Sequence, residues 1–472
     1  MVRDSTTPLV RIVADRLFSR VAGADRVQGN TLRLLRDGAE NYPAWLDAIA
    51  AARRFVHFEN YIIRDDAVGR RFAEALSAKA REGVPVRVLY DWMGCIATWP
   101  GFWGRLRAAG VDVRCFNRPR LDSPFGWLSR NHRKTIGIDG SLGFIAGLCV
   151  GQVWEGDPKQ GTEPWRDTGV ELRGPAVTDL DAAFAQSWAW AGGELPPSDP
   201  PLQPPAAEGG IALRVVASKP NTMGIYRLDQ MIAGLARRRL WLTDAYFVGT
   251  TAYVRTLCDA AKDGVDVRLL VPGASDVAVT KALSRAGYRP LLEAGIRVFE
   301  WDGPMLHAKT AVADGKWARI GSSNLNLASW IGNWELDVAV EDEGFAAEME
   351  AMFEDDLEHA TEIVLAARGV HAAERRPPRP GGRGSPGRLR AGAVGLGSTL
   401  TAAITNHRAL GPAEATVMAV GGGLLLALAI IAVVLPRLVT IPLALLTGWI
   451  GITLVIRAVR LGWGRGAEDG PP

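Results

Sequence analysis

The feature that most constrains how this chain folds is a short stretch that occurs twice with the spacing H-x-K-x4-D. The two copies consist of His132, Lys134 and Asp139, and of His307, Lys309 and Asp314. Alternating residues around Val312 predict a short strand, which places His307 and Lys309 on one face. A titratable imidazole beside an ammonium group suits an oxyanion, above all a phosphate.

The segments around the two copies repeat as well. Three pairs match in order: 55–63 with 240–247, 83–90 with 264–270, and 109–114 with 294–299. With the match of His132 to His307, the offsets run from 175 to 185 residues. This spacing indicates one unit used twice, because solenoid repeats are far shorter. Predicted strands alternate along the chain with segments of helical periodicity. We therefore expect an α/β fold in which each half is a mixed, mostly parallel sheet flanked by helices. Packing of the halves about a pseudo-twofold axis would bring both histidines to one centre.

Composition divides the chain into successive segments. We expect a lead-in at 1–29, a first half at 30–191, a proline-rich linker at 192–210, a second half at 211–366, a basic flexible linker at 367–413, a transmembrane hairpin at 414–457 and a cytoplasmic tail at 458–472. With 48% hydrophobic and 22% charged residues, the bulk of the chain is predicted to be globular. A net charge of only +3 argues against a general nucleic-acid binder.

The hairpin is predicted from two apolar runs, 416–435 and 438–456, that contain no charged residue. At about 1.5 Å per residue, each run reaches roughly the 30 Å of a bilayer's hydrocarbon core. A re-entrant hairpin and two buried core helices are the alternatives. Arginines before and after the runs place both ends, and the globular body, on the cytoplasmic side. The four cysteines lack paired or zinc-ligand spacing, which fits reduced thiols in that compartment.

A phosphodiester reaction can be assembled from these parts without a metal or a cofactor. One imidazole attacks phosphorus to form a phosphohistidine; the other protonates the departing alkoxide and later accepts a proton from the incoming alcohol or water. The lysines, with Ser322 and Asn324 of a Gly-Ser-Ser-Asn turn, are placed to hold phosphate oxygens. Asp167 and Glu335 are expected to orient the imidazoles, and the sequence leaves open which acid serves which histidine.

Plainer alternatives stand beside these expectations. A single H-x-K on a strand is usually an ordinary half-buried strand, and the second copy at a matching position is what argues for chemistry. Asp139 and Asp314 belong to the motif and are kept among the candidate catalytic residues, yet each precedes a glycine, which favours a turn. His57 lies in an apolar strand and is expected to be a core residue.

The paired motifs resemble the phospholipase D superfamily and, within it, bacterial cardiolipin synthases. The likeness covers roughly residues 30–360, with matching pieces at 37–38, 42–43, 58–62, 83–89, 131–134, 165–168 and 321–324. It implies two phospholipase D-like halves that transfer a phosphatidyl group between phospholipids and release glycerol, at the inner membrane of a bacterium. Phosphatidylglycerol is the expected substrate. By likeness His132 is the nucleophile and His307 the acid/base, or the reverse.

Other functions stay open on the sequence: a phospholipase D that produces phosphatidic acid, a phosphodiesterase or nuclease of the same superfamily, and a scaffold with a vestigial site. Cys149 stands where the family has an asparagine, so either the phosphate is held unequally or Cys149 is simply a small buried residue. The aromatic, Gly/Pro-containing loop at 92–103 either contacts a membrane or packs into the core. The sequence makes no prediction about oligomeric state.

Overall fold

The computed structural model describes residues 8–119, 128–196, 204–276, 278–366, 369–372 and 433–464, with single helical positions at 423, 426 and 430. Three predicted segments therefore lie wholly or largely outside the described residues: the centre of the proline-rich linker, the basic linker and the first apolar run.

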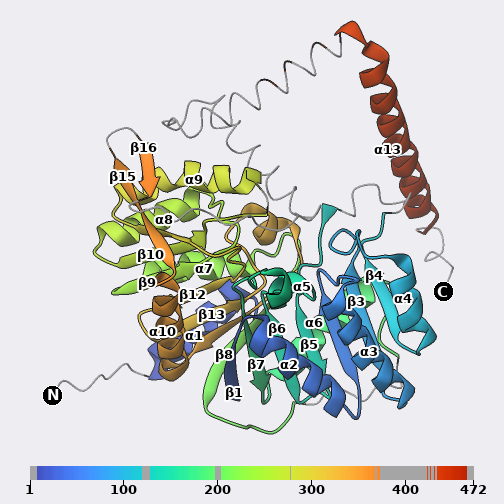
Figure 1. Ribbon diagram of the computed structural model, residues 1–472, viewed down its shortest axis with the longest axis horizontal. Helices are drawn as coiled ribbons and strands as arrows, with labels where there is room; N and C mark the ends of the chain where they lie inside the picture. The colour runs from blue at the N-terminus through green and yellow to red at the C-terminus, as the bar shows by residue number, and fades with distance from the viewer. Residues whose placement is uncertain are drawn as a thin grey trace, which may run out of the picture.

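The first half consists of strands with helices packed against them (Figure 1). Its strands are β1 (Val27–Arg36), β2 (Val56–Asn60), β3 (Val86–Asp91), β4 (Asp112–Phe116), β5 (Thr135–Ile138), β6 (Leu142–Ala146) and β7 (Thr168–Arg173). Its helices are α1 (Pro8–Ala22), α2 (Asp37–Ala51), α3 (Ala67–Arg81), α4 (Pro100–Ala108), α5 (Gln152–Glu155) and α6 (Val177–Trp190).

The second half repeats this order. Its strands are β8 (Ile211–Ser218), β9 (Arg239–Thr243), β10 (Asp266–Pro272), β11 (Arg297–Trp301), β12 (Thr310–Ala313), β13 (Trp317–Gly321), β14 (Glu335–Glu341), β15 (Ala360–Ala366) and β16 (Gly369–Ala372). Its helices are α7 (Gly224–Leu235), α8 (Thr251–Lys262), α9 (Ala278–Glu293) and α10 (Glu343–Leu357). Strand β16 falls where the sequence predicted a flexible linker.

All of these strands belong to one sheet, in the order β16-β15-β11-β10-β9-β12-β13-β14-β8-β1-β7-β6-β5-β2-β3-β4. Leaving aside β15 and β16, the order is symmetric about the central pair of β8 and β1, which run antiparallel. Each strand of one half thus has a counterpart in the other, as an internal duplication requires.

The expectation of mostly parallel sheets is wrong. Only β2-β3-β4 and β9-β10-β11 are parallel, whereas β2-β5-β6-β7-β1 and the matching strands of the second half are antiparallel. One cause is a tight turn in each motif, at Asp139-Gly140 and at Asp314-Gly315, which makes β5-β6 and β12-β13 antiparallel hairpins. Antiparallel neighbours can be joined by such short turns, while parallel neighbours need long crossovers.

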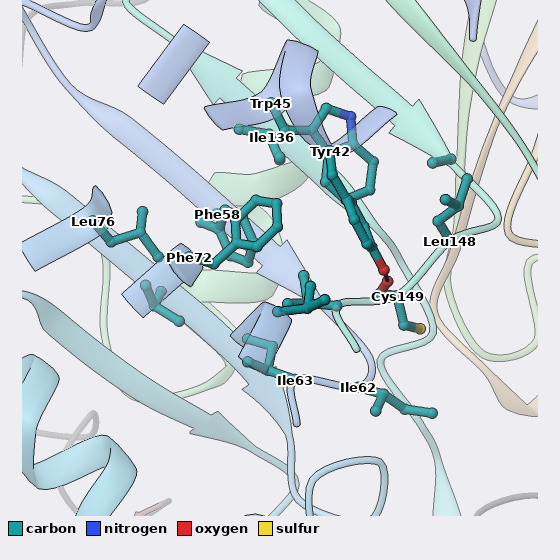
Figure 2. Packing of buried hydrophobic residues seen from close by; sticks show 14 of the residues in the cluster. Tyr42, Trp45, Phe58, Ile62, Ile63, Phe72, Leu76, Ile136, Leu148 and Cys149 are labelled. Atoms are coloured by element: carbon teal, nitrogen blue, oxygen red, sulfur yellow. Dashed lines mark hydrogen bonds between the residues drawn. The ribbon is translucent and has the colours of Figure 1, made fainter. Parts of the chain in front are cut away.

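A core shared by the halves holds them together. Apolar residues of β1, β6 and β7 pack in one buried cluster with residues of β8, β13 and β14. A second core lies mostly in the first half, where Tyr42, Phe58 and Phe72 pack closely (Figure 2), and it also includes Tyr246 and Met305 of the second half. Within the N-terminal lead-in, α1 ends at Ala22, which belongs to the core of the second half.

His57 is a core residue, as expected. Its ring stacks between Phe55 and Phe184, with centroid distances of 4.4 and 4.3 Å. Its Nδ1 lies 2.9 Å from a carboxylate oxygen of Asp181.

The second apolar run forms a helix, α13 (Pro436–Gly464), drawn in red in Figure 1. Large apolar side chains on it are exposed, among them Leu438, Leu445, Ile452 and Val455. Within the part of the chain that the structure describes, no helix has the length and apolar character of a membrane span.

Candidate active site

Each motif histidine lies in an extended segment just before a hairpin, His132 before β5 and His307 before β12. Both segments are fastened to the opposite half by backbone hydrogen bonds. The N–H of His132 donates to the carbonyl of Trp334 at 2.8 Å, and the N–H of His307 donates to that of Arg166 at 2.7 Å. The halves therefore meet at the two histidines, which is the arrangement that the repeat predicted.

The carboxylates are exchanged between the halves. The Nδ1 of His132 lies 2.9 Å from Glu335 Oε2, and the Nδ1 of His307 lies 2.7 Å from Asp167 Oδ2. A carboxylate only accepts hydrogen bonds, so each Nδ1 must carry the proton. That tautomer leaves Nε2 of each ring with its lone pair, as a nucleophile or a general base requires.

Burial favours the neutral form of both rings, whereas contact with the histidines favours the ionised form of both acids. His132 is 9% exposed and His307 4%, and Asp167 and Glu335 are fully buried. Burial lowers the pKa of His132 to about 4 and that of His307 to about 3, the latter helped by nearby Lys309. Although burial alone would raise them, the histidine partners lower the pKa of Asp167 and of Glu335.

The motif lysines lie beside the rings. Lys134 Nζ donates to the backbone carbonyl of His132 and Lys309 Nζ to that of His307, and Lys309 Nζ also lies 2.9 Å from the Nδ1 of His307. Burial lowers the pKa of Lys134, and lowers that of Lys309 to about 8. Two ammonium groups thus lie at a centre that also contains two carboxylates.

Two tyrosines complete the symmetric arrangement and were not singled out from the sequence. Tyr61, after β2, meets His132 edge-on with a centroid distance of 4.8 Å, and Tyr246, after β9, meets His307 at 5.9 Å. Each ring also lies near the lysine of its own half. The repeat could have identified them, because they occupy equivalent positions in the repeated segments 55–63 and 240–247.

The environment of His307 is more aromatic than that of His132. Trp154 and Trp165 lie 5.6 and 5.8 Å from the His307 ring, and the indole N–H of Trp154 donates to Asp167 at 3.0 Å. The sequence analysis did not single out Trp154, and it included Trp165 only in the family match at 165–168, because no repeat marks either residue.

The turn after each hairpin differs between the halves. Ser322 Oγ donates to Glu335 at 2.6 Å and so supports the carboxylate that orients His132. Asn324 is 5% exposed, and its Oδ1 has no hydrogen-bond partner among the described residues. Cys149 occupies the corresponding place after β6 and is buried. Its carbonyl accepts a hydrogen bond from the Tyr42 hydroxyl at 2.6 Å (Figure 2), and the residue is close enough to affect the pKa of Lys134 and Lys309.

Asp139 and Asp314 lie away from the histidines, in the hairpin turns. Their backbones adopt φ of 57° and 53°, and their carboxylates accept backbone N–H bonds from residues 53–55 and 237–239. Such contacts fix the turn, and they support the structural alternative over a catalytic one for both residues.

Chemically, this centre offers two imidazoles with oriented Nε2 atoms, two lysines and a buried amide. Among the described residues, no group of three or more His, Cys, Asp or Glu side chains is arranged to hold a metal ion. The arrangement suits an anionic group that is attacked from one side and loses a substituent on the other.

The chain is similar in sequence to known proteins. A family model described as "Cardiolipin synthase, PLD-like domain" matches residues 230–357. The chain is 38% identical over 351 residues to cardiolipin synthase A of Pseudomonas aeruginosa, covering 73% of this chain and 70% of the relative. It is 36% identical over 345 residues to cardiolipin synthase A of Pseudomonas putida, covering 71% and 70%.

Solved structures agree on the fold. Phosphatidylserine synthase of Haemophilus influenzae superposes with a TM-score of 0.55 at 13% identity, over 74% of this chain and 91% of that one. Polyphosphate kinase of Porphyromonas gingivalis gives a TM-score of 0.50 at 13% identity, over 78% and 53%. Taken together, the paired site and the extent of identity with the synthases show that this chain belongs to the cardiolipin synthase family of phospholipase D-like enzymes.

Proposed function

We propose that this enzyme transfers a phosphatidyl group from one phospholipid to the hydroxyl of another through a phosphohistidine, with release of glycerol when phosphatidylglycerol is the donor. The observation that carries the proposal is the exchange of carboxylates, which gives both histidines the same tautomer and leaves the Nε2 atom of each ring free of its carboxylate. The names of the relatives support the substrate class.

In the first step, Nε2 of His132 forms a bond to phosphorus, and the glycerol oxygen leaves with a proton from Nε2 of His307. In the second step, His307 takes the proton of the acceptor's hydroxyl, whose oxygen attacks phosphorus and releases His132. His307 must be protonated for the first step, although burial disfavours its charged form. The anionic diester and Asp167 offset that cost by favouring the imidazolium ion.

The remaining polar groups hold the phosphate. Lys134, Lys309 and the amide of Asn324 bind the non-bridging oxygens as negative charge develops on them. Asp167 and Glu335 keep the imidazoles in place, with Ser322 behind Glu335. Asp139 and Asp314 hold the hairpin turns and touch no reacting group.

The enzyme is further proposed to be membrane-associated, with its catalytic body on the cytoplasmic side of a bacterial inner membrane. The exposed apolar side chains of α13 and the uncharged runs that flank Pro436 support a tether formed by a helical hairpin. The arginine-rich stretch before the runs supports the cytoplasmic orientation.

Product analysis tests the proposal. The purified enzyme is incubated with phosphatidylglycerol as the sole lipid, and cardiolipin and free glycerol are expected in equal amounts. Phosphatidic acid without cardiolipin would instead assign the enzyme as a phospholipase D, because water can take the acceptor's place at the same phosphohistidine. Quenching with denaturant at alkaline pH during turnover preserves the acid-labile P–N bond, and peptide mapping at the same pH is expected to locate the phosphatidyl group on His132.

A further inference from the structure

We propose that residues 96–100 form a membrane-contacting patch that seats the first half of the enzyme on an anionic phospholipid bilayer next to the active site. This patch, hereafter the 96–100 patch, is separate from the C-terminal tether. The inference rests on the proposed function only in taking a lipid as the substrate.

The patch exposes apolar side chains on an ordered loop. Trp99 is 70% exposed and Ile96 46%, and Ala97 and Pro100 are exposed beside them. The aromatic residues that follow, Phe102 and Trp103, are buried. The sequence left open whether this loop contacts a membrane or packs into the core. The later aromatic residues lie in the core, and the earlier apolar residues face outward.

Buried contacts fix this exposure. The hydroxyl of Thr98 donates to the carbonyl of Ile63 at 2.5 Å, and the N–H of Ile63 donates to the sulfur of Cys95 at 3.2 Å. Thr98 and Cys95 point inward from the loop, so their neighbours Ile96 and Trp99 are held outward. Two large apolar side chains kept in water cost free energy unless a partner covers them.

The same loop is attached to the active site. Asp91 accepts hydrogen bonds from the N–H groups of Met93 and Gly94 through one oxygen, and from the N–H of Asn131 through the other at 2.9 Å. Asn131 directly precedes His132. Gly94 also packs so closely on Tyr61 that a Cβ there would lie 1.9 Å from the Tyr61 carbonyl oxygen. The loop that carries the patch is thus linked to Asn131 and Tyr61, which both adjoin His132.

The charge around the patch suits an anionic surface. Residues 92–108 contain no acid, and α4 carries Arg105 and Arg107 directly after the patch. The Arg105 side chain is 61% exposed and lies 3.5 Å from Asp65, which it shares with Arg70. Tryptophan prefers the boundary between lipid headgroups and acyl chains, and arginine binds lipid phosphates there.

A bilayer fits this patch better than a protein partner. A specific protein interface usually buries about 1,000 Å² or more, which far exceeds what two large side chains and their neighbours present. Shallow insertion into a bilayer needs only a few such residues. A diacyl substrate must also leave the bilayer at the enzyme surface, and a contact beside His132 shortens that path.

The test compares the full-length double variant I96S/W99S with the control L17S/L235S, which removes two similarly exposed leucines from α1 and α7. Each is assayed on phosphatidylglycerol vesicles and on short-chain phosphatidylglycerol below its micelle concentration. We expect I96S/W99S to lose about tenfold or more of kcat/KM on vesicles and to retain wild-type activity on monomers, with the control unchanged on both. An equal loss on both substrates, or no loss on vesicles, would overturn the proposal.

A second measurement does not depend on turnover. Vesicles of phosphatidylglycerol and phosphatidylcholine with brominated acyl chains quench tryptophans that reach the bilayer, and W99F should lose a resolvable part of the quenching seen for the wild type. Identical quenching would show that Trp99 does not reach the lipid. If the wild type converted neither form of phosphatidylglycerol, the proposed function would fail, while the quenching difference would still decide the patch.

Discussion

At the scale of single residues, each motif histidine is paired with an acid that the opposite half supplies. His132 relies on Glu335 and His307 relies on Asp167, over sequence separations of 203 and 140 residues. An amide has nearly the shape of a carboxylate, but it carries an N–H donor where the carboxylate only accepts hydrogen bonds. Replacing the acid with its amide therefore acts on the tautomer of the imidazole.

Glu335→Gln is therefore expected to slow phosphohistidine formation by roughly 10²- to 10⁴-fold, because an amide N–H facing Nδ1 moves the ring proton to the attacking Nε2. Asp167→Asn should slow the reaction comparably with phosphatidylglycerol, through loss of the acid. A lipid with a p-nitrophenol leaving group needs no acid and should restore phosphohistidine formation in Asp167→Asn alone. Rapid-quench trapping measures both steps.

Glu362→Gln, on β15 and paired with Arg297, serves as the control and should match the wild type. Rescue of Glu335→Gln rather than Asp167→Asn would reverse the assignment and make His307 the nucleophile.

The unequal turns lead to a second residue-scale prediction. Asn324→Ala is expected to lower kcat by about 10²- to 10³-fold, as loss of one donor to a developing oxyanion does. Cys149→Ala, at the corresponding position, should stay within about threefold, because a thiol is a weak donor. Steady-state kinetics on both variants measures the contrast, and similar losses would show that both turns hold the phosphate.

At the scale of secondary-structure elements, a buried arginine joins α10 to the active site. Arg166 forms two hydrogen bonds with Asp356 near the end of α10, at 2.7 and 2.8 Å, and a third with Asp37 at 3.2 Å. Its own carbonyl accepts the N–H of His307. Arg166 therefore links α10 to the segment that contains His307.

Asp356→Asn is expected to lower the free energy of unfolding by about 3–5 kcal/mol, because it leaves the buried Arg166 without its main counter-charge. The neighbouring Asp355→Asn is a matched control: its carboxylate is 52% exposed and pairs with Arg36, so a loss of at most about 1 kcal/mol is expected. Urea unfolding followed by circular dichroism measures both. Equal effects would show that the Arg166 pair does not hold α10.

At the scale of the whole molecule, one continuous sheet makes the two halves a single unit. Strands β1 and β8 pair at its centre, and a common core lies across that pair. Each half also supplies the acid for the other half's histidine. Neither half can therefore hold a complete site by itself.

A chain with a protease site inserted between residues 196 and 204 should stay assembled and active after cleavage, since covalent continuity adds little to such an interface. Size-exclusion chromatography and cardiolipin formation before and after cleavage measure this. Separation of the fragments with retained activity in one of them would contradict the shared site, and an uncut chain with the same insertion is the control.

Much of the site was predictable because its polar residues occur in short sequence motifs. The histidines, the lysines and the turn with Asn324 stand at fixed spacings, and the structure brings them together. Strand direction was not predictable in the same way, since apolar runs look alike in parallel and antiparallel strands. Tyr61 and Trp154 were missed because their role appears only when distant segments pack against a histidine.

By itself, the sequence determined that one α/β unit is used twice and that each copy contributes an imidazole and an ammonium group. Only the tertiary structure decided that Glu335 serves His132 and that Asp167 serves His307. The physical reason is that a hydrogen bond between residues so far apart in the sequence depends on how the two halves pack. Local sequence patterns do not specify that packing.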